Sequence, residues 1–150
     1  MHKSIKLIFC STGLLLSLPL PAAGDLTAQA PTEITVQLGD AENHLRFFPE
    51  RIELETGRLY KLVLHNKSPQ KHYFSSDGFS RAVFTRKIQV LDPSGTDIAE
   101  IKGTIRELEI YPAQQAEWWL IPVKSGIYDD LRCTIAGHAE QGMLGTIVVR

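Results

Sequence analysis

The sequence predicts an all-β protein, built as a β-sandwich or a barrel, and three observations support this. Short segments in which apolar and polar residues alternate recur along the chain, as half-buried strands require. Turn-forming pairs such as Gly39-Asp40 and Ser125-Gly126 separate these segments. Apolar residues at helical spacing are rare. Many short strands at this spacing are typical of two packed sheets or a closed barrel.

The segments with strand character are followed by turn-forming residues. In chain order, the predicted strand segments are residues 33–38, 45–48, 51–54, 59–66, 87–91, 104–110, 117–123, 127–133 and 145–149. The segment 75–103 is compatible with helix, strand or loop. Phe79 and Val83 are four residues apart, as on one helical turn, whereas Pro93-Ser94-Gly95 indicates a hairpin.

The first 24 residues are typical of a secretory signal peptide. A short basic start is followed by the mostly apolar residues 7–20 and by the small residues of Pro21-Ala-Ala-Gly24. The apolar run is shorter and more interrupted than a membrane span of about 20 residues. We therefore predict cleavage after Gly24, a periplasmic protein without stable membrane insertion, and one mature domain at 25–150.

Composition excludes two classes of protein. Of the 150 residues, 43% are hydrophobic and 22% are charged, and the formal net charge is -1. A disordered acidic tail would be less hydrophobic, and a nucleic-acid-binding domain would be strongly basic. We therefore expect one compact domain with no nucleic-acid partner.

One cysteine and one methionine remain after the predicted cleavage, Cys133 and Met143. A single thiol in an exported protein cannot form an intramolecular disulfide. Cys133 is then a buried apolar residue, an intermolecular bridge, a nucleophile or a metal ligand. Nucleophilic catalysis with His138 would need a third orienting group, which the sequence does not indicate.

Cys133, His138 and Met143 lie in one predicted loop between two strands, and Gly137 and Gly142 allow the loop to bend tightly. Such a loop can direct a thiolate, an imidazole and a thioether to one point. These soft donors suit copper better than magnesium, calcium or manganese. Zinc also binds Cys and His, but a thioether is a poor zinc ligand.

A trigonal copper site with an axial thioether needs a second imidazole. The candidates are His44, His65 and His72. His72 is preferred because it follows a polar loop directly after the strand 59–66, and loops at one end of a sandwich can meet. His65 lies within a strand and His44 in a polar turn, so both are interpreted as ordinary polar residues.

The pattern Cys-x4-His-x4-Met-x-Gly, followed by Ile-Val-Val, resembles the ligand loop of the blue copper proteins, the cupredoxins, and is most similar to the loops of rusticyanin and azurin. The resemblance covers residues 117–150 and, more weakly, 47–74. It implies a Greek-key β-sandwich with one type 1 copper ion that alternates between Cu(I) and Cu(II). It also implies four ligands, which are the equatorial His72, Cys133 and His138 and the axial Met143.

This chain departs from the family pattern in three places. Tyr73 stands where many members have Asn or Ser after the first histidine. Gly126 and Cys133 are one residue further apart than in related strands, which predicts a bulge or a different register. The segment 75–103 has no family counterpart and is interpreted as inserted.

The resemblance implies a monomeric electron carrier, not an enzyme, that passes single electrons between redox proteins docking near His138. Oxidase and nitrite-reducing copper centres need additional histidines. The alternative is a periplasmic protein for copper buffering, delivery or tolerance, which would use the same ligands. A sandwich that has lost its metal and acts as an adhesion or assembly module is a further alternative.

Overall fold

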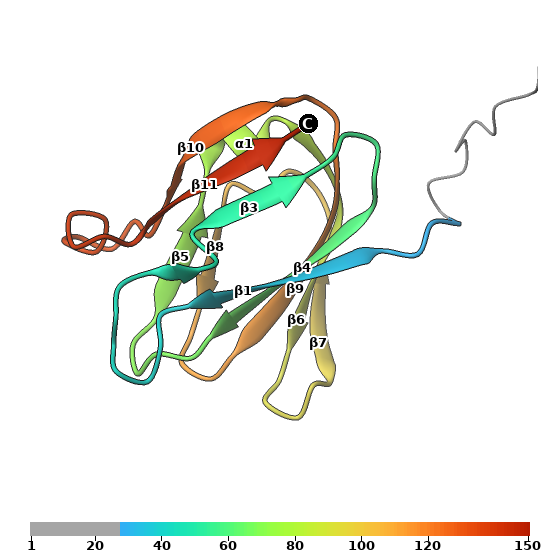
Figure 1. Cartoon of the computed structure of the whole chain (residues 1–150). Coiled ribbons are helices and arrows are strands. Elements are labelled where there is room, and N and C mark those ends of the chain that lie inside the picture. The colour runs from blue at the N-terminus through green and yellow to red at the C-terminus, as the bar shows by residue number, and fades with distance from the viewer. Residues whose placement is uncertain (1–27) are drawn as a thin grey trace, which may run out of the picture.

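The computed structural model describes residues 28–150, so the predicted signal peptide at 1–24 lies outside the described residues. Two mixed sheets pack against each other (Figure 1). The prediction of an all-β sandwich is confirmed. Within the described range, no helix has the length and apolar character needed to cross a membrane.

The first sheet has six strands in the order β2-β1-β4-β9-β6-β7. Strand β1 pairs with β4 in parallel, and the other pairs are antiparallel. The strands are β1 (Thr32–Leu38), β2 (Phe47–Phe48), β4 (Tyr60–Asn66), β6 (Val83–Leu91), β7 (Asp97–Ile101) and β9 (Gln115–Pro122).

The second sheet has five strands in the order β3-β11-β10-β5-β8, and here β11 pairs with β3 in parallel. A short helix, α1 (Asp77–Ser80), follows β5. The strands are β3 (Arg51–Leu54), β5 (His72–Ser75), β8 (Glu107–Ile110), β10 (Gly126–Arg132) and β11 (Leu144–Val149).

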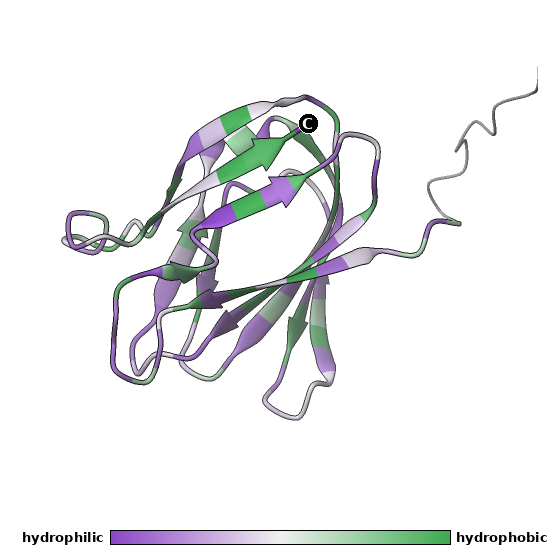
Figure 2. Ribbon diagram, in the orientation of Figure 1, coloured by the Kyte–Doolittle hydropathy of each residue, from purple (hydrophilic) through white to green (hydrophobic). Residues whose placement is uncertain are grey.

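The core lies between the two sheets and follows the alternation along the strands (Figure 2). In β3, Ile52 and Leu54 are buried, whereas Arg51 and Glu53 are exposed. The buried side chains come from both sheets, and aromatic rings pack edge to face among them. In such alternating strands, apolar burial therefore determines which face points inward.

Each predicted segment contains a strand, but two strands were not predicted. Strand β5 begins at His72, which sequence reasoning placed directly after a polar loop, and β7 lies in the segment that was left open. Both strands are short, at 4 and 5 residues, and β7 is exposed along its whole length. A period of two is hard to detect over so few residues. Strand β8 is also shorter than the predicted 104–110.

Most of the segment 75–103 belongs to the first sheet, although Ser75 ends β5 of the second sheet. The segment contains α1, β6 and the hairpin that leads to β7, and the hairpin turn is closed by a hydrogen bond from Asp92 N to Thr96 O. Strand β6 pairs with β9 along its whole length, and Ile88 is fully buried. Within this segment, only β7 lies at a sheet edge.

The predicted bulge is present in β10. Its pairing with β11 shifts register between Tyr128 and Leu131. The extra residue accounts for the longer spacing between Gly126 and Cys133. Because β10 ends at Arg132, Cys133 is the first residue beyond the strand.

We expect Ile88→Val to lower the free energy of unfolding by about 0.5–1.5 kcal/mol, because it removes a buried methylene from the contact between β6 and the core. The matched control is Ile98→Val in β7, where the side chain is 63% exposed, and its effect should stay within about 0.5 kcal/mol. Urea unfolding of both variants measures the difference. Equal effects would contradict the role of β6 in the core.

Candidate metal centre

The loop between β10 and β11 carries Cys133, His138 and Met143, and it projects beyond the ends of the sheets (Figure 1). Cys133 N donates to Met143 O at 3.1 Å, and Met143 N donates to His138 O at 2.9 Å. Gly137 and Gly142 have φ of 83° and 108°, a region that favours glycine. The backbone of the loop therefore ties the three predicted ligand residues to one another.

His72 reaches this loop from the start of β5, 61 residues earlier in the chain than Cys133. Cys133 Sγ lies 3.9 Å from His72 Nδ1 and 3.4 Å from His138 Nδ1. The two imidazole ring centroids are 5.1 Å apart. The fold thus brings together donor atoms from two distant stretches of sequence, all within 4.8 Å of one another.

The predicted ligand residues are buried. The exposed fraction is 0% for His72 and Met143, 1% for Cys133 and 6% for His138. The two imidazole Nδ1 atoms and the sulfur are atoms that can each offer an electron pair to a metal ion. Buried polar groups of this kind require a partner. This set of atoms fits a soft metal ion. The role of Met143 as the fourth ligand stays a prediction.

The sulfur of Cys133 also receives a hydrogen bond from the backbone N–H of Tyr73, at 3.3 Å. Such a bond stabilises negative charge on a thiolate. Tyr73 follows His72 directly, so β5 provides both the imidazole and this donor. The backbone makes this contact, which does not depend on the Asn or Ser that many family members have at this position.

A polar turn between β4 and β5 supports His72 from the side opposite Cys133. The hydroxyl of Ser68 is hydrogen-bonded to His72 Nε2 at 2.7 Å. Asn66, the last residue of β4, is fully buried and accepts a hydrogen bond from Ser68 N at 2.9 Å. Sequence reasoning noted Asn66 as the strand end but missed Ser68, and its position four residues before His72 was the available signal.

Gly39, the residue directly after β1, packs against the same turn. A Cβ atom at this position would lie 2.7 Å from Ser68 Cβ and 3.0 Å from His72 Nε2, and the φ of +62° also favours glycine. Sequence analysis treated Gly39 only as a turn former. In the structure, its lack of a side chain leaves room for the ring of His72.

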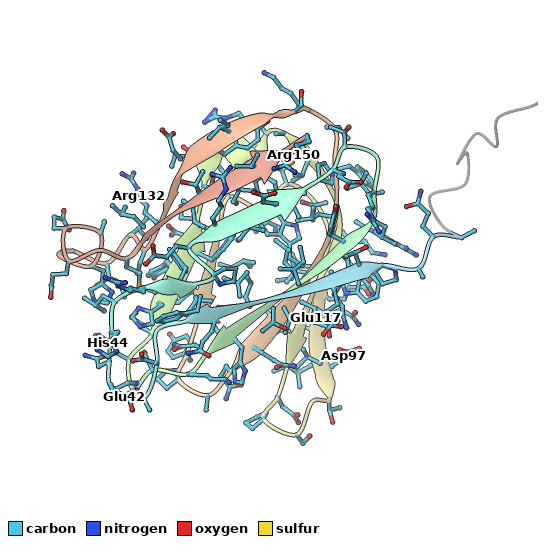
Figure 3. All side chains as sticks on the ribbon, in the orientation of Figure 1. Glu42, His44, Asp97, Glu117, Arg132 and Arg150 are labelled. Carbon is cyan, nitrogen blue, oxygen red and sulfur yellow. The ribbon has the colours of Figure 1, made fainter. Side chains whose placement is uncertain are left out.

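The other two candidate histidines lie outside this group, as predicted. His44 is exposed, and its Nδ1 pairs with Asp40 Oδ2 at 2.7 Å. Figure 3 labels His44 beside Glu42 on the outside of the molecule. The donor atoms of Asp40, Glu42 and His44 also lie within 4.8 Å of one another, but Glu42 and His44 are exposed to water. His65 is half-buried in β4.

Burial, followed by the nearby His138, lowers the pKa of His72 from its ordinary value of 6.5 to about 4. The imidazole is therefore neutral at pH 7, the form that binds metal ions.

This shift predicts that the metal-free protein loses stability as the pH falls from 7.5 to 5. In this window the unfolded chain takes up a proton at residue 72 that the folded chain does not, so protonation favours unfolding. The expected loss at pH 5 is about 2 kcal/mol. Urea unfolding of the wild type and of His72→Gln measures it. An equal pH dependence in the variant would contradict the assignment to His72.

Comparison with known proteins gives matches in structure but not in sequence. No family model and no curated protein matches the sequence. Auracyanin B is similar over 85% of this chain and 95% of its own length, with 18% identity and a TM-score of 0.52. The auracyanin of Roseiflexus castenholzii is similar over 81% and 99%, with 17% identity and a TM-score of 0.53.

Larger copper proteins contain a similar fold. The copper-containing nitrite reductase of Thermus scotoductus matches with 14% identity and a TM-score of 0.59 over 83% of this chain. This chain spans only 31–32% of the length of that protein, of the copper nitrite reductase of Nitrosomonas europaea and of the multicopper oxidase of Campylobacter jejuni.

The order of the strands, the convergence of His72 with the β10–β11 loop and the similarity to auracyanin over nearly its whole length agree with one another. This chain therefore has the cupredoxin fold, and its buried His72, Cys133, His138 and Met143 fit a type 1 copper site.

Proposed function

We propose that this protein holds one copper ion with His72, Cys133, His138 and Met143 and carries single electrons between redox proteins in the periplasm. The observation that carries the proposal is the approach of both Nδ1 atoms to one sulfur, at 3.9 Å and 3.4 Å, in a buried site. A bound copper ion would supply one-electron chemistry, since it alternates between Cu(I) and Cu(II) with such ligands.

The chain's own residues would keep the site nearly unchanged between the two oxidation states. The loop is held by the hydrogen bonds of Cys133 and Met143, and His72 is held by the turn that contains Ser68. Donor atoms that are already in place need little rearrangement when the charge of the ion changes. A small rearrangement favours fast electron exchange.

The comparisons support a carrier over an enzyme. This chain covers 95% and 99% of the two auracyanins, one of which was solved after reduction with dithionite. It covers only 31–32% of the Campylobacter jejuni oxidase and of the two nitrite reductases. The similarity therefore extends over nearly the whole length of the auracyanins but over only part of these enzymes.

The proposed docking site for redox partners is the surface around His138. This residue keeps 6% of its surface exposed, more than the other three predicted ligands. Apolar side chains surround it in the loop, and electron-transfer partners bind through small interfaces. The surface is formed by Ile135, Ala136, Ala139 and Leu144, of which Leu144 is 48% exposed. We propose that the protein acts as a monomer.

Burial of the ligands argues for electron transfer over copper delivery. An electron can pass through packed protein, whereas an ion cannot leave until the β10–β11 loop opens. Copper delivery would require an accessible ligand to begin the exchange with a partner, and even His138, the most exposed of the four, keeps only 6% of its surface exposed.

The test is to add Cu(II) to the purified mature protein. We expect intense visible charge-transfer absorption, a narrow copper hyperfine splitting and fast electron self-exchange. A colourless protein would refute the type 1 site. A coloured protein with sluggish self-exchange and strong retention of Cu(I) would support copper buffering instead.

A further inference from the structure

Ser68 lies in the turn between β4 and β5, and its hydroxyl is 2.7 Å from His72 Nε2. Both residues are buried, with exposed fractions of 4% for Ser68 and 0% for His72. A short contact between two buried polar atoms is a hydrogen bond, and its direction decides which ring nitrogen of His72 carries the proton.

The neighbours of Ser68 determine this direction. Its Oγ also lies 2.7 Å from the carbonyl oxygen of Gln70, which can only accept. The single hydroxyl proton of Ser68 is therefore donated to Gln70. Toward Gln70 N, at 3.2 Å, and toward His72 Nε2, the same oxygen must accept. The proton of His72 therefore lies on Nε2.

The turn has little freedom to adopt another arrangement. Asn66 Nδ2 donates to Gln70 O and to Ile110 O, both at 2.8 Å. Its Oδ1 accepts from Ser68 N, so the orientation of the amide is settled as well. Gly39 packs against the turn from the other side, where a Cβ would be 2.7 Å from Ser68 Cβ. The polar groups of the turn are mutually satisfied, which makes the network rigid.

We propose that Ser68 is a positioning residue for the metal centre. It holds His72 as the tautomer with the proton on Nε2, so that Nδ1 presents a free lone pair toward Cys133 Sγ, 3.9 Å away. A hydrogen bond at the outer nitrogen of a ligand histidine orients the ring and raises its basicity. The proposal deepens the copper function and rests on it for its effect on the metal, but not for the tautomer itself.

The tautomer can be measured without copper. Nitrogen-15 NMR of the metal-free wild type at pH 7 is expected to show His72 protonated at Nε2. In Ser68→Ala, a mixture with the Nδ1-protonated form is expected, because the acceptor that selected Nε2 is gone. A wild type protonated mainly at Nδ1 would overturn the proposal, and so would an unchanged tautomer in Ser68→Ala.

The effect on copper is measured next. Ser68→Ala should weaken Cu(II) binding by about 10–100-fold. This is the usual effect of removing a side chain that is hydrogen-bonded to a metal ligand. Cu(II) gains more than Cu(I) from a basic imidazole, so the reduction potential should rise, by about 59 mV for each tenfold change in the ratio of the two affinities.

The matched control is Ser80→Ala in α1. Ser80 is 2% exposed, and its hydroxyl donates to a backbone carbonyl, Asp77 O, at 2.9 Å. Ser80→Ala should lower the free energy of unfolding by about as much as Ser68→Ala does, without changing the reduction potential or the copper spectrum. If both variants leave the copper properties unchanged, the role of Ser68 is refuted. If the wild type shows the Nε2 tautomer but binds no copper, the copper function fails and the tautomer assignment stands.

Discussion

Cys133→Ser is expected to abolish the visible charge-transfer absorption of the copper-loaded protein and to weaken Cu(II) binding by more than about 100-fold. Cys133 Sγ is the atom that both imidazole Nδ1 atoms approach. A serine hydroxyl is neither soft nor readily ionised, so it cannot replace the thiolate. Removing a side chain that is only hydrogen-bonded to a metal ligand lowers the metal affinity by about 10–100-fold, and removing the ligand itself should lower it more. Absorption spectra and competition titrations with a copper chelator measure both effects.

The control for this experiment is His65→Gln. His65 is a half-buried histidine of β4 and lies outside the group of converging donors. Its replacement should leave the colour and the copper affinity unchanged. Blue or green absorption that persists in Cys133→Ser, or that disappears in His65→Gln, would show that copper binds elsewhere.

Gly39→Ala is expected to lower the free energy of unfolding by about 2–5 kcal/mol and to alter the copper spectrum. The backbone at φ +62° costs a residue with a Cβ about 1–2 kcal/mol. The new Cβ would also lie 2.7 Å from Ser68 Cβ and 3.0 Å from His72 Nε2. Overpacking of this kind costs about 1–3 kcal/mol more, and relief of the clash would displace His72.

Gly57→Ala separates these two contributions. Gly57 has φ +74°, but its added Cβ would meet nothing within 4 Å in the described part of the chain. This variant should show the backbone cost alone and keep the wild-type copper spectrum. If both alanine variants lose equal stability and have the same spectrum, Gly39 has no role in placing His72.

The β10–β11 loop shows how much of the site could be predicted. Cys133, His138 and Met143 are close in sequence, and the glycines between them indicate a loop that turns back. The soft donor chemistry of these residues pointed to copper before any fold was known. Local spacing is sufficient here because the loop itself brings its three side chains together.

Strand β5 shows where local spacing was not sufficient. His72 was preferred among three histidines, and the structure places its Nδ1 3.9 Å from Cys133 Sγ. It does so as the first residue of a strand that was not predicted, and β5 pairs with the end of β10 through a single registered pair, Ser75 with Arg132. A pairing between segments so far apart leaves no periodic signal in the sequence.

The sequence by itself determined the all-β class, the alternation of most strands and the donor set of the β10–β11 loop, because burial and turn chemistry act over a few neighbouring residues. Only the tertiary structure decided that His72 meets Cys133, that the hydroxyl of Ser68 lies within hydrogen-bond distance of His72 Nε2 and that Gly39 leaves space for both. These contacts join β1, β5 and the turn after β4. They depend on how two sheets pack, a property of the whole chain that residue spacing does not contain.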